Sequence, residues 1–223
     1  MNFKHPLILA SSSPRRQFLM KEAGFQFTVA SPNIDESFPA TLAVEAIPQY
    51  LAEKKARVFQ NQLKEEVVVT SDTMVILDGE VLNKPTDRSD AIAMLTRLSG
   101  KTHLVITAVC LMSKSKIDCF DDRTEVTFRN LTLKEIEFYV DHFKPFDKAG
   151  AYGAQDTLPA GLNPCSPEEI DFLKQIDKPD LIRKSIRDMA SGTGITIIEK
   201  INGAYFTVMG LPLHKVYSHL KAF

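Results

Sequence analysis

Hydroxyl and guanidinium side chains gather near the start of the chain, in the run Ser11-Ser12-Ser13-Pro14-Arg15-Arg16. The run follows the apolar residues 7–10 and precedes a helical pattern that ends at Gly24. Backbone N–H groups at a helix N-terminus favour an anion, and arginine offers forked donors that match phosphate oxygens. We therefore expect a phosphate site here, with a plain N-cap followed by solvated arginines as the alternative. No P-loop or GxGxxG pattern occurs.

Acidic residues form a second candidate group. Asp72 follows the apolar run 67–69 and the pair Thr70-Ser71, so we predict that it lies at the carboxyl end of a buried strand. A carboxylate there could bind a hard cation or act as a base toward water; alternatively, it caps the next element. Asp35 and Glu36 lie in a polar loop and could bind a metal or act as a base. Their alternative is a pair of solvated loop acids.

Two lysine positions could offset phosphate charge. Lys54 and Lys55 lie on a predicted helix over residues 43–62, where one side chain can face a cleft and the other water. Lys84 precedes the rigid Pro85. Each of these lysines could also be simply solvated. The five histidines show no metal-ligand spacing, so we expect no histidine-based metal centre.

The apolar pattern predicts the scaffold that must position these residues. Asp78-Gly79 and Asn202-Gly203 predict two hairpins, and Thr132 with Glu135 predicts a capping box at a helix start. Because strands and helices mix throughout, the class is α/β or α+β with a mixed sheet. The predicted strands cover residues 7–10, 25–30, 67–70, 74–77, 80–82, 102–112, 117–128, 195–201 and 204–208, and the predicted helices end at Gly24 or cover residues 43–62, 87–98, 132–143 and 211–220.

Composition limits the partners of this chain. Of its 223 residues, 44% are hydrophobic and 25% are charged, and the formal net charge is -1. A chain with this charge and no basic stripe is not drawn to nucleic acid or to an anionic membrane, and no stretch approaches transmembrane length. Three cysteines without a CxxC pair fit a reducing cytoplasm. We expect a cytoplasmic protein without nucleic-acid or membrane partners.

The region 156–194 is the one irregular part of the chain. It holds four prolines and three glycines around two amphipathic stretches, 168–176 and 181–189. We interpret it as an inserted helical hairpin or lid. The alternative is an ordered surface embellishment without a role.

Eight stretches of the chain together resemble the Maf family of nucleotide pyrophosphatases. They run in family order over nearly the whole chain. They are LASSSPRR (9–16), Ile34-Asp35-Glu36, AEKKAR (52–57), SDTMV (71–75), GEVLNKP (79–85), LSGKTH (98–103), DKAGAYGAQ (147–155) and VMGLPL (208–213).

This resemblance implies a Maf-like (ITPase-like) α/β fold. It has a mixed sheet, flanking helices and two lobes around a central cleft, with residues 1–223 forming a single domain that is usually a homodimer. It also implies hydrolysis of a nucleoside triphosphate to a monophosphate and pyrophosphate, with Mg²⁺ or Mn²⁺ as cofactor. By position Asp72 matches the family's catalytic acid, taken to be the base that activates water. The matching phosphate residues are Ser11, Arg16, Lys55 and Lys84, and the metal candidates are Glu36 and Asp72.

The family branches differ in substrate, and three positions bear on the choice. The branch acting on dTTP and UTP carries residues matched here by Arg15, Thr73 and Gln155. The branch acting on 7-methyl-GTP tends to carry Trp at the first of these positions, and this chain has no Trp. We therefore favour dTTP and UTP, possibly with modified pyrimidine nucleotides. The alternatives are a pyrophosphatase for 7-methyl-GTP or another modified nucleotide, and a nucleotide-sensing binding protein with incidental hydrolysis.

Overall fold

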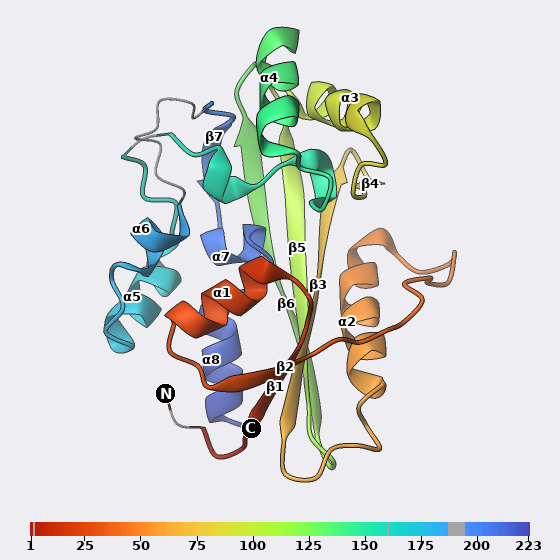
Figure 1. The fold of residues 1–223 in the computed structure, drawn as a ribbon, viewed down its shortest axis with the longest axis vertical. Coiled ribbons are helices and arrows are strands. Elements are labelled where there is room, and N and C mark those ends of the chain that lie inside the picture. Colours follow the sequence, from red (N-terminus) through yellow and green to blue (C-terminus); the bar gives the residue numbers. More distant parts are fainter. Residues whose placement is uncertain (2, 160, 187–194) are drawn as a thin grey trace.

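The computed structural model describes residues 1, 3–159, 161–186 and 195–223. At its centre lies a mixed sheet with the strand order β2-β1-β3-β5-β6-β7, and β4 pairs with β3 (Figure 1). β1 is parallel to β2 and β3, whereas the other neighbouring strands are antiparallel. The strands are β1 (Leu7–Ala10), β2 (Phe27–Ala30), β3 (Val67–Leu77), β4 (Glu80–Leu82), β5 (Thr102–Met112), β6 (Ile117–Phe128) and β7 (Ile198–Asn202). The predicted mixed α/β class is confirmed.

Helices cover both faces of this sheet. α2 lies on one face, and α1 and α8 lie on the other (Figure 1). The helices are α1 (Pro14–Glu22), α2 (Ile47–Arg57), α3 (Arg88–Leu98), α4 (Leu133–Phe143), α5 (Pro167–Gln175), α6 (Leu181–Ser185), α7 (Tyr205–Val208) and α8 (Leu213–Lys221). Short 3-10 turns occur at Val44–Ala46, Ala149–Ala151 and Ala154–Asp156.

The alternation of side chains along β3 divides the core into two parts. Successive residues of a strand point to opposite faces of the sheet. Val67, Val69 and Val75 therefore join the large core with α1 and α8, whereas Val68 and Met74 pack on the face that α2 covers. By the same alternation, Ser71 and Thr73 point to the face that α1 and α8 cover. Asp72 points to the face that α2 covers.

Local signals predicted several element boundaries correctly. The side chain of Ser13 caps α1, which begins at Pro14. The capping box of Thr132 and Glu135 opens α4. Asp78 and Gly79 have positive φ angles of 53° and 81°, as a tight hairpin turn requires.

Two predictions about strands were wrong. β3 does not end near Asp72; it continues to Leu77, because β5 pairs with it along its length from Val68 to Ile76. The predicted second hairpin is also wrong, since β7 pairs with β6 and the chain then turns into helix α7. The reason is tertiary, because a distant carboxylate, that of Glu169, accepts the first backbone N–H groups of α7.

The described part of the region 156–194 packs against the main core. α5 buries Phe172 and Leu173, and Leu181 of α6 is buried beside them. α5 also contacts α8. Residue 160 and residues 187–194, which include the end of the second predicted amphipathic stretch, lie outside the described residues. That the region is an insertion or a lid, and that the domain has two lobes, stay predictions.

No helix in the described part of the chain is long and apolar enough to cross a membrane. The three cysteines, Cys110, Cys119 and Cys165, are free thiols.

Candidate functional site

The sheet has a gap along one edge of β3. β1 pairs with β3 only as far as Leu9 and Val69, and β4 pairs with it from Val75 onward. Among the described strands, residues 70–74 of β3 therefore have a ladder partner only on the β5 side. Because β1 runs parallel and β4 antiparallel to β3, the loops that follow these two strands approach the gap from opposite ends. Side chains on both faces of β3 are accessible there.

A cavity of about 670 Å³ opens at this gap. Its volume is within the range of small-molecule sites in proteins. The structure brings together around this cavity the nine residues that the family resemblance assigned to the site: Ser11, Arg15, Arg16, Glu36, Lys55, Asp72, Thr73, Lys84 and Gln155. The roles assigned to these residues stay predictions.

Lys55 joins the two acidic candidates on the α2 face of the sheet. Its Nζ lies 2.7 Å from Asp72 Oδ1 and 2.8 Å from Glu36 Oε1. Ala52 and Ala56, fully buried neighbours on the same side of α2, pack on the sheet and bring Lys55 down onto β3. Lys54 points elsewhere and donates to the carbonyl oxygen of Ser37. The prediction that one lysine of this pair faces a cleft is thus confirmed for Lys55, whereas Lys54 does not line the cavity.

The acidic loop presents only one of its two carboxylates to the cavity. Asp35 accepts hydrogen bonds from the backbone and side chain of Ser37 and does not line the cavity. Partial burial acts to raise the pKa of Glu36, but the hydrogen bond and charge of Lys55, with the charges of Lys84 and Arg16, lower the pKa overall. Glu36 is therefore a carboxylate at neutral pH.

Arg16 connects three segments on the other face of β3. Its Nη1 donates to the carbonyl of Ser71 at 2.9 Å, and its Nε donates to the carbonyl of Gly210 at 2.8 Å. Its Nη2 donates to Thr73 Oγ1 at 3.0 Å, and a longer bond of 3.4 Å reaches Ser11 Oγ. Four of the five N–H groups of the guanidinium thus have protein acceptors.

Burial lowers the pKa of Arg16 to about 10, although the charge of Asp72 acts in the opposite direction. The guanidinium therefore stays protonated at neutral pH. Its positive charge contributes to the electrostatic potential in the cavity, whereas its hydrogen bonds described above go to protein atoms. This arrangement makes Arg16 a tether of the site as well as a candidate phosphate ligand.

A second group of side chains that line the cavity comes from residues 147–155 and Arg15. Asp147 lies between Arg15 and Lys148, at 3.0 Å and 2.7 Å. Gln155 is 7% exposed, and its Oε1 has no hydrogen-bond partner in the described part of the chain. A buried amide with a free acceptor is suited to reading the polar edge of a ligand.

The charge of the cavity differs from that of the whole chain. Five lysines and arginines line it against three carboxylates, although the chain as a whole has a formal net charge of -1. The cations are Arg15, Arg16, Lys55, Lys84 and Lys148. A local excess of positive charge within a concave site attracts an anionic ligand.

The acidic residues of the cavity suit a cation that is shared with a ligand. No group of three or more His, Cys, Asp and Glu side chains in the described ranges could hold a metal ion by itself. Glu36 and Asp72, however, are brought together on Lys55. Mg²⁺ is commonly held by one or two carboxylates together with substrate phosphates, so this donor set fits such an ion.

Sequence reasoning assigned no role to several residues that line the cavity. Asp147, Lys148 and Gly210 lie within stretches that carry the family resemblance, which is the signal that could have found them. Gly210 has a φ of 99°, and a Cβ there would lie 3.2 Å from Thr73 Oγ1. Its backbone conformation and its closeness to Arg16 both require glycine.

Comparisons with known proteins agree with one another. A family profile described as Maf-like protein matches residues 6–162. A dTTP/UTP pyrophosphatase of Bacteroides fragilis is 40% identical over 220 residues, which cover 98% of this chain and 96% of that protein. One of Flavobacterium psychrophilum is 40% identical over 215 residues, covering 96% and 92%. The structure of a HAM1 protein from Coxiella burnetii covers 84% of this chain and 99% of its own at 13% identity, with a TM-score of 0.40 that is too low to bear on fold or function.

Proposed function

This chain belongs to the family of Maf-like proteins, and we propose that it hydrolyses dTTP and UTP to the nucleoside monophosphate and pyrophosphate. The observation that carries this proposal is the similarity to proteins named dTTP/UTP pyrophosphatase along 98% of the chain. A cation-rich cavity lined by the nine residues that the resemblance assigned to the site gives it physical support.

The triphosphate lies among the cations of the cavity. Lys55 and Lys84 neutralise phosphate oxygens, and Ser11 adds a hydroxyl donor at the end of β1. The N-terminus of α1, next to that hydroxyl, contributes the positive end of the helix dipole. Its first residue, Pro14, has no N–H group, and Ser13 accepts that of Arg16. Arg16 adds its charge from behind, held by its bonds to the protein.

Asp72 is the group that we assign to the attacking water. Lys55 holds its Oδ1, so Oδ2 is the oxygen that takes a proton from water as the water oxygen attacks the α-phosphorus. The bond from the α-phosphorus to the bridging oxygen then breaks, and pyrophosphate leaves. Charge stabilisation and positioning supply most of the acceleration in reactions of this kind.

Glu36 and Asp72, together with the triphosphate, would hold a divalent cation, Mg²⁺ or Mn²⁺. The ion supplies additional positive charge that stabilises charge developing on the phosphates.

We assign base selection to Gln155, Arg15 and Thr73, which line the cavity. Gln155 can both donate to and accept from a pyrimidine edge, because its amide has an N–H₂ group and an oxygen. Arg15 is held there by Asp147. Thr73 also lines the cavity, and its hydroxyl contacts Arg16. We also propose that the protein is a cytoplasmic homodimer, which size-exclusion chromatography with light scattering would test for its oligomeric state.

A panel of triphosphates tests the function. Release of pyrophosphate and monophosphate is measured for dTTP, UTP, CTP, GTP, ATP and 7-methyl-GTP, with Mg²⁺, with Mn²⁺ and with EDTA. We expect the kcat/KM values for dTTP and UTP to exceed the others by about tenfold or more, since a polar pocket rejects a base that leaves its groups unpaired. Asp171→Asn, which changes an exposed carboxylate on α5, is the matched control. A preference for 7-methyl-GTP, or tight binding without turnover, would contradict the proposal.

A further inference from the structure

A buried hydroxyl lies behind the cavity and is not part of its lining. Thr107 of β5 is directly opposite Thr73 of β3 in the sheet register, and it is 0% exposed. Its Oγ1 is 3.0 Å from Thr73 Oγ1 and donates to the carbonyl oxygen of Thr207 at 2.7 Å. Thr107 is therefore one hydrogen bond away from a residue that lines the cavity and two away from Arg16.

The direction of these bonds follows from the number of hydrogens. A threonine hydroxyl has one hydrogen and two lone pairs. The hydrogen of Thr107 goes to a carbonyl, which can only accept, so the hydrogen between the two threonines belongs to Thr73. Thr73 in turn accepts from Nη2 of Arg16. The order is thus Arg16 N–H to Thr73 O–H to Thr107 O–H to the Thr207 carbonyl, which we name the hydroxyl relay.

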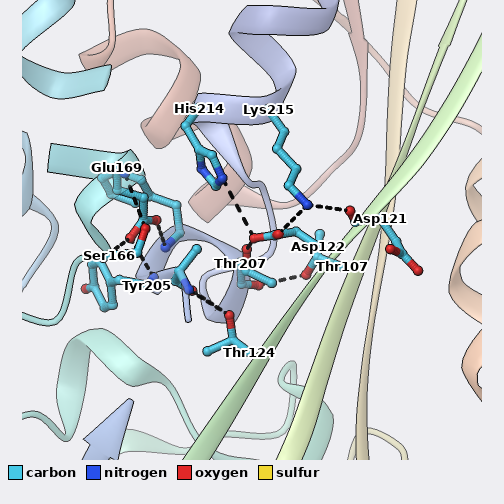
Figure 2. A network of polar contacts seen from close by, with 12 residues as sticks. Thr107, Asp121, Asp122, Thr124, Ser166, Glu169, Tyr205, Thr207, His214 and Lys215 are labelled. Atoms are coloured by element: carbon cyan, nitrogen blue, oxygen red, sulfur yellow. Dashed lines mark hydrogen bonds and ion pairs between the residues drawn. The ribbon is translucent and has the colours of Figure 1, made fainter. Parts of the chain in front are cut away.

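The acceptor at the end of the hydroxyl relay is anchored firmly. Thr207 lies in α7, whose first backbone N–H groups donate to the carboxylate of Glu169, and the Thr207 hydroxyl donates to Asp122. Lys215 lies 2.5 Å from the other oxygen of Asp122. Figure 2 shows Thr107 beside Thr207 on one side of this network and Glu169 on the other. These contacts hold α7 in place, so we expect the Thr207 carbonyl to keep its position when the Thr107 hydroxyl is removed.

We propose that Thr107 is a positioning residue for substrate selection, which acts by fixing the hydroxyl of Thr73 as an acceptor and, through Thr73, the guanidinium of Arg16. The proposal rests on the proposed pyrophosphatase function. In this arrangement the Thr73 hydroxyl cannot donate a hydrogen bond to a substrate, because it already donates its hydrogen to the Thr107 oxygen. A base can meet Thr73 only with an N–H group, as the N3–H of uracil and thymine provides.

Loss of the Thr107 hydroxyl leaves the hydrogen of Thr73 without its acceptor. In Thr107→Val, which keeps the shape of the side chain, the hydrogen of Thr73 has no acceptor and can turn toward the cavity. The carbonyl of Thr207 loses the Thr107 hydroxyl but keeps the backbone N–H of Gly210 as a donor at 3.0 Å. Thr73 then becomes a possible donor to a base oxygen or ring nitrogen, and the acceptor of Arg16 is no longer fixed.

Three variants test this proposal. Thr107→Val removes the hydroxyl, and Thr107→Ser restores it. Thr124→Val is the matched control, because Thr124 is also buried and its hydroxyl bonds to the backbone of Ala204, which is not a member of the relay. The readouts are kcat and KM for each triphosphate, melting temperature, and the ¹⁵N NMR signals and exchange protection of the Arg16 side-chain N–H groups.

We expect kcat/KM for dTTP to fall roughly tenfold in Thr107→Val, about the effect of losing one hydrogen bond between uncharged groups. The ratio of dTTP to CTP turnover should fall by about fivefold or more, since a freed Thr73 donor suits the unprotonated N3 of cytosine. Thr107→Ser should keep both values within about twofold of wild type, and Thr124→Val should lower only the melting temperature.

Unchanged preference in Thr107→Val, or equal loss in Thr107→Ser, would overturn the role of the hydroxyl. If the wild-type protein releases no pyrophosphate from any triphosphate, the proposed function fails on its own. The hydroxyl relay is then still decided by NMR. Protection of the Arg16 N–H signals in wild type and Thr107→Ser, but not in Thr107→Val, supports it, and equal protection in all three refutes it.

Discussion

Asp72 and Glu169 are both nearly removed from solvent, at 8% and 0% exposure, but their partners differ. Asp72 shares the ammonium group of Lys55 with Glu36 and borders an open cavity. Glu169 instead accepts backbone N–H groups of Ser166, Tyr205 and Phe206 at 3.0, 2.8 and 2.7 Å (Figure 2). No salt bridge within the described ranges includes Glu169.

The difference shows how one residue type can serve two purposes. A cation compensates the charge of Asp72, so the carboxylate remains available beside a cavity. Burial raises the pKa of Glu169 to about 7, against the lowering effect of its backbone hydrogen bonds, and the charge of Asp122 adds to the rise. Glu169 is thus a structural clamp between α5 and α7, whereas Asp72 is placed for chemistry. The following predictions test this division.

Asp72→Asn should have the largest effect. It keeps the shape of the side chain but removes the base, so we expect turnover of dTTP to fall on the order of 10³-fold. Melting temperature should change little, because Glu36 still accompanies Lys55. Pyrophosphate release and thermal unfolding measure the two quantities. Near wild-type turnover in Asp72→Asn would remove the catalytic assignment.

Glu169→Ala should affect stability rather than chemistry. It leaves the first N–H groups of α7 buried without an acceptor, at a cost of about 3 kcal/mol in the free energy of unfolding. The folded fraction should turn over dTTP at a rate within about threefold of wild type, since Glu169 does not line the cavity. Glu168→Ala, an exposed neighbour on α5, is the control for urea unfolding. A large loss of turnover in fully folded Glu169→Ala would erase the distinction between the two carboxylates.

The stability of the protein should depend on pH through Glu169. Its pKa rises from an ordinary 4.5 in the unfolded chain to about 7 in the folded one. The free energy of unfolding should therefore be highest below pH 4.5, fall as pH rises to about 7, and stay constant above pH 7 as far as Glu169 is concerned. A shift of this size corresponds to a loss of up to about 3 kcal/mol.

Glu169→Gln cannot ionise, so its unfolding free energy should lack this fall between pH 4.5 and 7. The charge of Asp122 and the thiol of Cys165 face the same carboxylate, and both are kept in this variant. Urea unfolding of wild type and Glu169→Gln across this pH range measures the difference. If the unfolding free energies of the two proteins changed with pH in the same way, ionisation of Glu169 would cost little in the folded protein, contrary to this prediction.

Glu36→Gln should have the smallest effect. The Glu36 side chain is 55% exposed, so its bond to Lys55 contributes little to stability. We expect roughly a tenfold loss of turnover, because a weakened acidic pair leaves the cation and Lys55 less well held. Asp35→Asn is the matched control in the same loop, since Asp35 is turned away from the cavity. Equal effects of the two substitutions would argue against a special role for Glu36.

The local features of this protein were predictable from short stretches of sequence. Ser13-Pro14 marks the start of α1, Asp78-Gly79 turns β3 into β4, and Thr132 with Glu135 opens α4. These signals act within a few residues, where capping groups and turn conformations determine the backbone. The candidate site residues also came from sequence, but only the resemblance to a family joined them into one site.

Tertiary structure decided which of these residues touch. β5 extends β3 past Asp72, and the alternation of the strand sends Asp72 toward Lys55 and Thr73 toward Arg16. Arg16 and Gly210 are 194 positions apart, so no local pattern relates them. The sequence by itself determined which side chains are available for chemistry. The sheet register and the burial of Glu169 determined how these side chains are arranged. The physical reason is that the free energy of their hydrogen bonds and ion pairs depends on distant groups being brought together away from water.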